Sequence, residues 1–179
     1  MKSVIAFLTA SLLLLMPLNA NAASAQEIDA KVDQALQALY QHSAAGKALS
    51  RKAVGVLVFP DVIKAGIGIG GEYGEGALRI GGKTAGYYNV AAASIGFQLG
   101  AQIKSQVLLF MTQAALTKFR NSDGWEAGVD GSVALATLGA GGTIDSNTVQ
   151  QPIIGFIFSN KGLMYNLSIE GSKITRINR

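Results

Sequence analysis

Few side chains in this sequence are of the types that carry out nucleophilic or general acid–base chemistry. The chain has one histidine, His42, and no cysteine. A Ser-His-Asp arrangement would have to use His42, and no G-x-S-x-G segment is present to expose a serine. We expect His42, near the end of a predicted helix, to be solvated or to cap that helix. The sequence therefore argues against nucleophilic catalysis.

Two groups of acidic residues are the remaining candidates for metal or acid–base chemistry. Glu72 and Glu75 form the first group, and Asp123, Glu126 and Asp130 form the second. Neither group follows the D-x-[DN]-x-[DN]-G spacing of a calcium loop, and positions in turns and on strand surfaces fit them better. An enzyme acting on envelope lipids or glycans stays open only if Glu72, Glu75 or Asp130 converge in a pocket. We predict a binding or structural module rather than an enzyme, with no cofactor and no metal.

A glycine-rich segment, residues 66–71, matches the G-x-G-x-x-G pattern of dinucleotide-binding loops. That pattern works only where a helix begins directly after it, so that backbone amides meet the pyrophosphate. Here two carboxylates, Glu72 and Glu75, follow among glycines, which is a poor helix start. A P-loop also fails, because Ala77 stands where a glycine should precede residues 82–84. We interpret the segment as a glycine-rich strand and turn.

Three basic residues, Lys47, Arg51 and Lys52, form a candidate anion-binding patch. No acidic residue lies between Asp33 and Asp61 to neutralise them. An ordinary solvated connection is the alternative interpretation, because three cations on a surface are not a rare cluster. The net charge of +4 is too small to indicate a nucleic-acid partner.

The elements that must position this patch follow from hydrophobic spacing. Ile28, Val32, Leu36 and Leu39 recur at helical spacing, which predicts an amphipathic helix over about residues 26–45, ended by Gly46. The polar side of this helix is acidic. Residues 112–120 are the one later stretch with helical character.

Strands are predicted along most of the remaining chain. Alternating bulky and small residues predict half-buried strands at 95–103, 125–135 and 163–169, while successive apolar residues at 54–59, 107–111 and 153–158 predict strands buried on both faces. Asn160-Lys161-Gly162 has the chemistry of a turn. With 22 glycines in the chain, we predict a mostly β (α+β) fold: a strongly coiled antiparallel sheet or partly closed barrel of about eight strands.

The first 22 residues have the pattern of a secretory signal peptide. Lys2 precedes an apolar stretch, and Ala20-Asn21-Ala22 is a small-x-small cleavage site, with a second acceptable site after Ala25. A single domain over residues 23–179 is expected. Without cysteine there is no lipoprotein anchor, so we expect an exported, periplasmic protein, peripherally attached to a membrane at most.

Several segments together resemble the SYLF domain family, in their order and spacing over about residues 49–177. They are AVGVLVFP at 53–60, the glycine-rich 66–76, SIGFQLGAQ at 94–102, VLLFM at 107–111, and 161–163 with 169–172. This family occurs in yeast and animal endocytic adaptors and in many exported bacterial proteins. The resemblance implies a lipid-binding module, with phosphoinositides as the eukaryotic ligands and actin as a fungal partner.

For an exported bacterial member, the resemblance implies binding of an anionic phospholipid or another envelope amphiphile, and not of actin. The family's membrane contact is associated with a basic amphipathic start, whereas the predicted first helix here is acidic on its polar side. Lys47, Arg51 and Lys52 are therefore the lipid-binding candidates, with neighbouring apolar strand ends as a further contact. A small outer-membrane β-barrel or a structural envelope protein is the alternative, since about 157 residues suffice for eight membrane-spanning strands.

Overall fold

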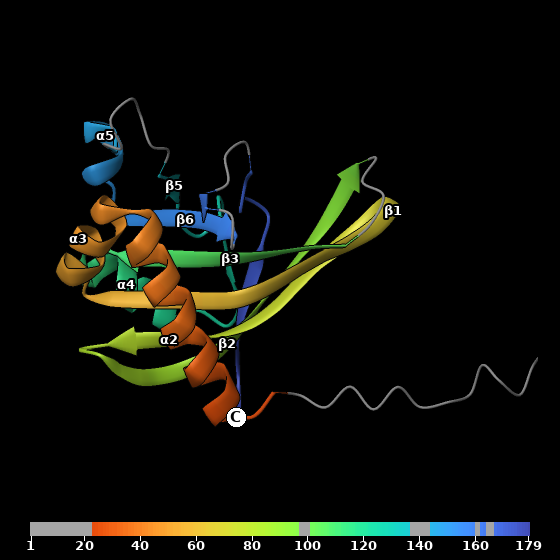
Figure 1. The fold of residues 1–179 in the computed structure, drawn as a ribbon, viewed down its shortest axis with the longest axis horizontal. Coiled ribbons are helices and arrows are strands. Elements are labelled where there is room, and N and C mark those ends of the chain that lie inside the picture. The colour runs from red at the N-terminus through yellow and green to blue at the C-terminus, as the bar shows by residue number, and fades with distance from the viewer. Residues whose placement is uncertain (1–22, 97–100, 137–143, 160–161, 164–166) are drawn as a thin grey trace, which may run out of the picture.

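A single coiled β-sheet forms the body of the molecule. The computed structural model describes residues 23–96, 101–136, 144–159, 162–163 and 167–179. Their strands are β1 (Gly55–Ile80), β2 (Lys83–Gly96), β3 (Ala101–Phe110), β4 (Trp125–Glu126), β5 (Ala134–Leu135), β6 (Ile153–Ser159), β7 (Gly162–Leu163) and β8 (Lys173–Ile177). These eight strands have the order β4-β8-β2-β1-β3-β6-β5, with β7 paired to β6. Every pair is antiparallel except β5 with β6. The sheet curls into a half-barrel (Figure 1), which confirms the predicted fold class.

The long strand β1 folds back on itself and contributes two legs to the sheet. Residues 55–65 pair with β3, and residues 68–80 pair with β2. The chain reverses between Gly66 and Gly70, where a Cβ on Gly66 would lie 2.3 Å from the Gly70 Cα. Further along, a Cβ on Gly76 would lie 1.9 Å from the carbonyl oxygen of Val58. Only glycine allows backbones to approach so closely, so these residues determine the coiling of the sheet.

Both faces of the central strands are covered, as their continuous apolar sequences predict. Along β1 and β3, Leu57 and Leu108 face one buried cluster, whereas Val58 and Val107 face the other. We call the first cluster the inner core and the second the outer core. The inner core includes Leu57, Phe59, Leu78, Tyr88, Leu108, Phe110, Phe119, Trp125 and Ile174, and the outer core includes Ile28, Val32, Leu39, Leu49, Val58, Val107, Leu109, Ile154 and Phe156.

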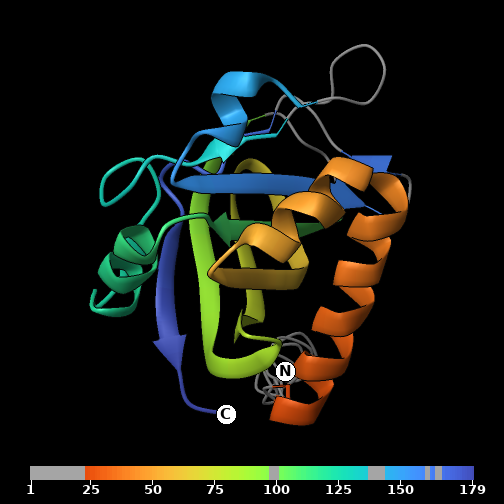
Figure 2. The same cartoon turned by 90° about the vertical axis from the view of Figure 1, so that its left-hand side faces the viewer.

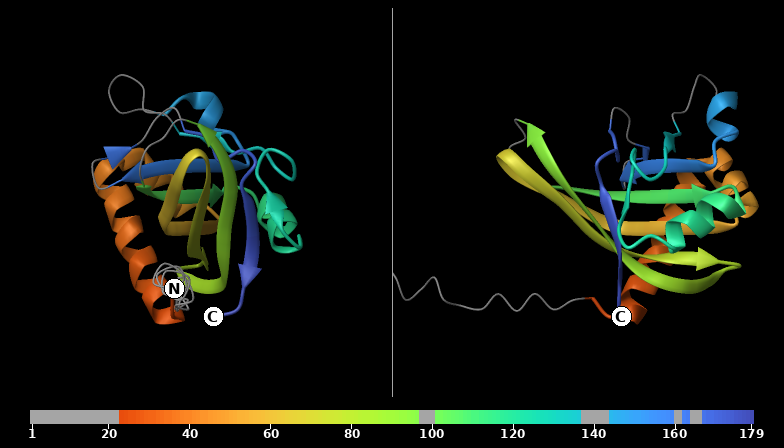
Figure 3. Two further views of the ribbon diagram at one scale, coloured as in Figure 1. Left: turned by 90° about the vertical axis from the view of Figure 1, so that its right-hand side faces the viewer. Right: turned by 180° about the vertical axis from the view of Figure 1, so that it is seen from behind.

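The helices cover opposite sides of the half-barrel. The helices α2 (Ala25–His42) and α3 (Ala44–Lys52) lie on the outer core, whereas α4 (Gln113–Arg120) lies against the inner core on the other side. Figures 2 and 3 show this division, with the short α5 (Ser146–Val149) at the top of the sheet. In the described part of the chain, no helix combines the length and apolar character needed to cross a membrane.

The predicted first helix is two helices in the structure. Ser43 ends α2 in an extended conformation, with a φ of -145°, and its hydroxyl accepts a hydrogen bond from the Gly46 backbone amide at 2.9 Å. Ser43 is therefore the N-cap of α3, which is a common role for serine. The prediction that Gly46 ends the helix is wrong, because Gly46 lies inside the first turn of α3 against Leu39. The later helix, predicted over 112–120, is confirmed as α4.

Three predicted half-buried strands differ from the structure. The pattern at 95–103 is divided between β2 and β3, which run in opposite directions, and residues 97–100 lie outside the described part of the chain. The pattern at 125–135 is interrupted by a turn in which Asp130 accepts a hydrogen bond from the Glu126 amide at 2.7 Å. The pattern at 163–169 leaves strand geometry by residue 167. Alternation continues unchanged through a turn, so it does not reveal where a strand ends.

Two further predictions fall on residues that the structure leaves undescribed. They are the signal peptide at 1–22 and the first two residues of the Asn160-Lys161-Gly162 turn.

Replacement of Gly76 by alanine is predicted to destabilise the fold by at least about 2 kcal/mol, since the new Cβ would force the legs of β1 apart. Gly71→Ala is the matched control on the same strand, because its Cβ would meet nothing closer than 3.6 Å. Urea denaturation followed by circular dichroism measures both variants. Equal midpoints for the two variants would contradict the role given to the close approach of the legs.

Candidate functional site

The three predicted lipid-binding cations lie on the exposed side of α3. Lys47, Arg51 and Lys52 are all exposed, whereas Leu49 and Ser50 turn to the interior. Lys47 and Arg51 are one helical turn apart and therefore project from the same side. None of the three forms an ion pair with a residue that the structure describes. The result is a short, solvated, positively charged surface, which we call the α3 patch.

Exposed apolar side chains gather at the opposite end of the molecule from the α3 patch. The reversal of β1 and the end of β2 project beyond the helices there (Figure 1). Ile103 is 61% exposed and Ile69 78% exposed, and Ile63 and Tyr73 are each half exposed. Ile63 and Ile103 are directly paired across the two strands. The structure therefore does not bring these apolar residues next to the predicted cations.

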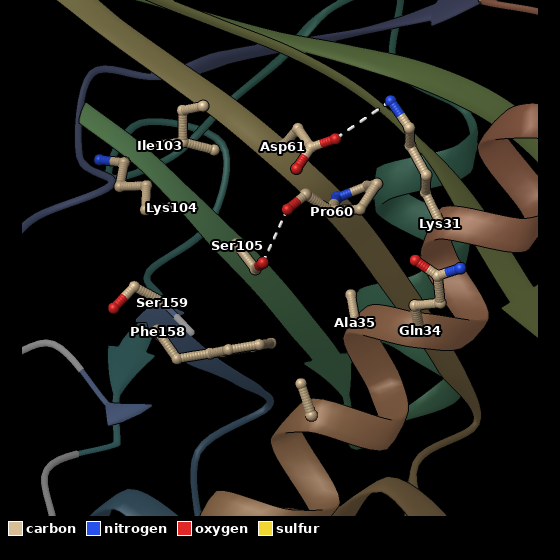
Figure 4. A pocket seen from close by; sticks show the side chains of 11 residues that line it. Lys31, Gln34, Ala35, Pro60, Asp61, Ile103, Lys104, Ser105, Phe158 and Ser159 are labelled. Carbon is tan, nitrogen blue, oxygen red and sulfur yellow. Dashed lines mark hydrogen bonds and ion pairs between the residues drawn. The ribbon is translucent and has the colours of Figure 1, made fainter. Parts of the chain in front are cut away.

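A groove runs between α2 and the strands β1, β3 and β6. Its volume is about 440 Å³, and its lining includes Gln34, Ala35, Ile103, Ser105 and Phe158. Figure 4 shows Lys31 of α2 reaching across its rim to Asp61 of β1. This ion pair has an Nζ–O distance of 3.2 Å, and the hydrogen bond to the Asp61 carboxylate raises the pKa of Lys31. The positive charge at the rim of this groove is thus already paired.

A second hollow, of about 430 Å³, lies on the other side of the Lys31–Asp61 pair. Tyr73, Glu75 and Arg179 contribute to its wall. Arg179 forms an ion pair with Glu75, and the Tyr73 hydroxyl donates to the same carboxylate at 2.8 Å. Burial, followed by this hydrogen bond, raises the pKa of Tyr73. The polar side chains in this wall are therefore paired with one another through the Glu75 carboxylate.

The acidic side of α2 binds the sheet. Asp29 accepts hydrogen bonds from the hydroxyls of Thr84 at 2.7 Å and Tyr87 at 3.0 Å. The guanidinium of Arg79 forms an ion pair with Asp33 at 2.8 Å and donates to Thr84 at 2.7 Å. Sequence analysis missed this network, because its members are far apart along the chain. The acidic excess of the helix is explained in part by this contact with β1 and β2.

The carboxylates that could have formed an active site are dispersed. Glu72 was predicted to lie in a turn or on a strand surface, but its side chain is only 9% exposed and lies between Lys64 and Lys104. Glu75 pairs with Arg179, and Asp130 lies in the turn after β4. Glu72, Glu75 and Asp130 therefore do not converge in one pocket. Within the described ranges, no three His, Asp or Glu residues are arranged to hold a metal ion.

The two motifs rejected from sequence also have clear structural roles. Residues 66–71 form the reversal of β1, and a strand rather than a helix follows them. Gly81 and Gly82, with φ of 58° and 78°, form the turn between β1 and β2. His42 is exposed in the last turn of α2.

Loss of the Asp29 carboxylate is predicted to reduce stability by about 2 kcal/mol, because Thr84, Tyr87 and Arg79 would lose a shared charged acceptor. The variant is Asp29→Ala, and Glu27→Ala is the control, since Glu27 makes only an exposed pair with Lys31 worth ~0.5 kcal/mol or less. Urea unfolding midpoints report the difference. Indistinguishable midpoints would show that the network does not anchor α2.

Comparison with known proteins relates part of the chain to a known family. A family model described as Ysc84, Las17-binding protein actin regulator, matches residues 91–178. No curated protein matches the sequence significantly. The matched segment runs from the second half of β2 to β8 and includes β3 and β6, but it does not include β1 or the α3 patch. Residues 91–178 of this chain therefore match the SYLF (Ysc84) domain family, which is a family of binding modules.

Proposed function

We propose that this protein is an exported, non-enzymatic binding module that attaches to anionic phospholipid surfaces through Lys47, Arg51 and Lys52. The observation that carries the proposal is the α3 patch, in which three exposed cations have no ion-pair partner among the described residues. The match to a family of lipid- and actin-binding modules supports it.

The electrostatics of the α3 patch set the expected strength of this interaction. A lysine or arginine near an anionic bilayer contributes roughly 1 kcal/mol, so three contribute about 3 kcal/mol. This corresponds to roughly a hundredfold increase in partitioning onto the surface. Because the side chains are solvated, salt screens the attraction strongly. The proposed attachment is therefore peripheral, reversible and dependent on ionic strength.

Export to the cell envelope is part of the proposal. Of the two acceptable signal-peptidase sites, the start of α2 supports the one after Ala22. The Ser24 hydroxyl accepts a hydrogen bond from the Glu27 amide at 3.2 Å and caps the helix. Ala23 packs against the outer core. Cleavage after Ala22 would keep both residues, whereas cleavage after Ala25 would remove the cap. In an envelope compartment, a phospholipid surface is a more suitable partner than actin.

The mature protein is predicted to begin at Ala23, since this start retains the Ser24 cap. Intact-mass spectrometry of protein purified after export measures the N-terminus directly. A mass corresponding to a start at Gln26 would contradict the argument from the cap, and an uncleaved chain would contradict export with processing.

Binding to anionic vesicles is predicted to depend on the α3 patch. The test variant is Lys47→Gln/Arg51→Gln/Lys52→Gln, and vesicles of phosphatidylglycerol and phosphatidylcholine are sedimented at low and high salt. We expect the variant to lose roughly a hundredfold in partitioning at low salt. Binding to pure phosphatidylcholine should be weak throughout.

A control variant separates local attraction from net charge. Lys83→Gln/Lys173→Gln/Arg176→Gln removes the same number of exposed positive charges from β2 and β8. It should bind nearly as well as the unmodified protein. Equal losses in the two variants, or no binding of the unmodified protein to anionic vesicles, would refute the proposed site.

A further inference from the structure

A cluster of three charged residues, in which Lys104 is buried and Glu72 and Lys64 are half-buried, lies where the two legs of β1 meet β3. Glu72, on the second leg, lies 3.4 Å from the Lys64 ammonium on the first leg and 2.6 Å from the Lys104 ammonium on β3. The Lys104 side chain is 2% exposed and that of Glu72 9% exposed. Figure 4 shows the Lys104 ammonium pointing away from Asp61 and Lys31. Ile103 and Ser105 face the groove beside α2, and Lys104, which also borders the groove, directs its side chain from the opposite face of β3 because side chains alternate along a strand.

The charges of this cluster do not balance. Two ammonium groups share one carboxylate, which leaves a net charge of +1. The nearest other acidic residues on β1 are already paired, Asp61 with Lys31 and Glu75 with Arg179. In the described part of the chain, no second carboxylate pairs with Lys64 or Lys104. Since burial of an uncompensated charge is costly, the cluster is suited to receive one further negative charge.

An unsatisfied hydrogen-bond donor lies next to this excess charge. Gln106 is 3% exposed, and its Nε2 has no hydrogen-bond partner in the structure. Gln106 is two residues after Lys104 on β3, so both side chains leave the same face of the strand about 7 Å apart. A buried amide donor without an acceptor is uncommon and costs ~1–3 kcal/mol. An oxyanion between Lys104 and Gln106 would satisfy both groups.

The surroundings of the cluster suit the headgroup of an amphiphile. The described residues beyond it at the projecting end of the sheet, 65–71, 93–96 and 101–103, carry no charge. Lys64 and Lys104 are the charged residues that border these stretches on β1 and β3. The Lys64 side chain is 20% exposed, so the cluster is accessible to solvent from that side. A phosphodiester carries one negative charge, which equals the unbalanced charge of the cluster.

We propose that Lys64, Lys104 and Gln106 form a phosphodiester-binding site, with Glu72 as an internal competitor for the two lysines. This site is separate from the α3 patch. The nine residue-to-residue steps of extended strand from Gly55, just after α3, to Lys64 correspond to about 30 Å. The inference therefore goes beyond the surface attachment proposed above and does not depend on it.

Nuclear magnetic resonance titration of the exported protein tests this site. Dimethyl phosphate serves as the free phosphodiester, dihexanoylphosphatidylglycerol below its micelle concentration as the lipid form, and dihexanoylglycerol as the ligand without phosphate. We expect both phosphodiesters to shift the backbone amides of Lys64, Glu72 and Lys104 and the side-chain amide of Gln106. If the lipid form binds more tightly than dimethyl phosphate, the natural ligand is a lipid headgroup. If the two bind equally, the natural ligand is a free phosphodiester. No shift at these residues with either phosphodiester would overturn the proposal.

Variants separate a binding site from a purely structural clamp. Glu72→Gln removes the competitor and is expected to tighten phosphodiester binding at least tenfold, equivalent to 1.4 kcal/mol. A clamp alone would give lower stability and no gain in affinity. Lys104→Gln should weaken binding at least tenfold, while the exposed control Lys83→Gln should leave it unchanged. If the cluster variants fail to fold, the titration of the unmodified protein still decides the question. Shifts confined to α3 would support the α3 patch and refute this second site.

Discussion

The close approach of the two legs of β1 is the constraint on which the rest of the structure depends. Side chains normally keep neighbouring backbones apart, but glycines at 66, 70, 74 and 76 remove that spacing on one leg. The sheet can then coil tightly enough for both of its faces to enclose an apolar core. The same coiling places Glu72 over Lys64 and Lys104. Stability and the buried charged cluster therefore have a common origin in the backbone of β1.

The helices complete the outer face, and their attachment determines which charges remain free. Asp29 and Asp33 of α2 are engaged by Arg79, Thr84 and Tyr87, so the acidic side of this helix is partly turned to the sheet. The extended Ser43 then redirects the chain into α3, whose cations face solvent. Positive charge is thus available at two separated places, exposed on α3 and buried beside the projecting end. Surface attachment would use α3, and recognition of a single headgroup would use the projecting end of the sheet.

Much of the fold could be predicted because burial leaves a direct pattern in sequence. The stripe containing Ile28, Val32 and Leu39 predicted α2, and continuous apolar runs predicted the central strands. The ends of the strands were harder to predict, because the alternation of bulky and small residues around 95–103 is the same before and after the chain reverses. Of the candidate site, Lys47, Arg51 and Lys52 were selected because no acidic residue lies between Asp33 and Asp61, but the sequence did not predict that they lie on a second helix. The pairing of Glu72 with Lys104 did not, since it depends on how β1 folds back.

The central claim is that α3 faces an anionic membrane. Paramagnetic broadening from a spin-labelled lipid in phosphatidylglycerol nanodiscs measures most directly which amides approach the bilayer. The account predicts selective broadening of α3 around Lys47, Arg51 and Lys52, with the amides of β8 unaffected. Broadening confined to the reversal of β1 around Gly66 and Gly70, or spread evenly over the surface, would contradict it.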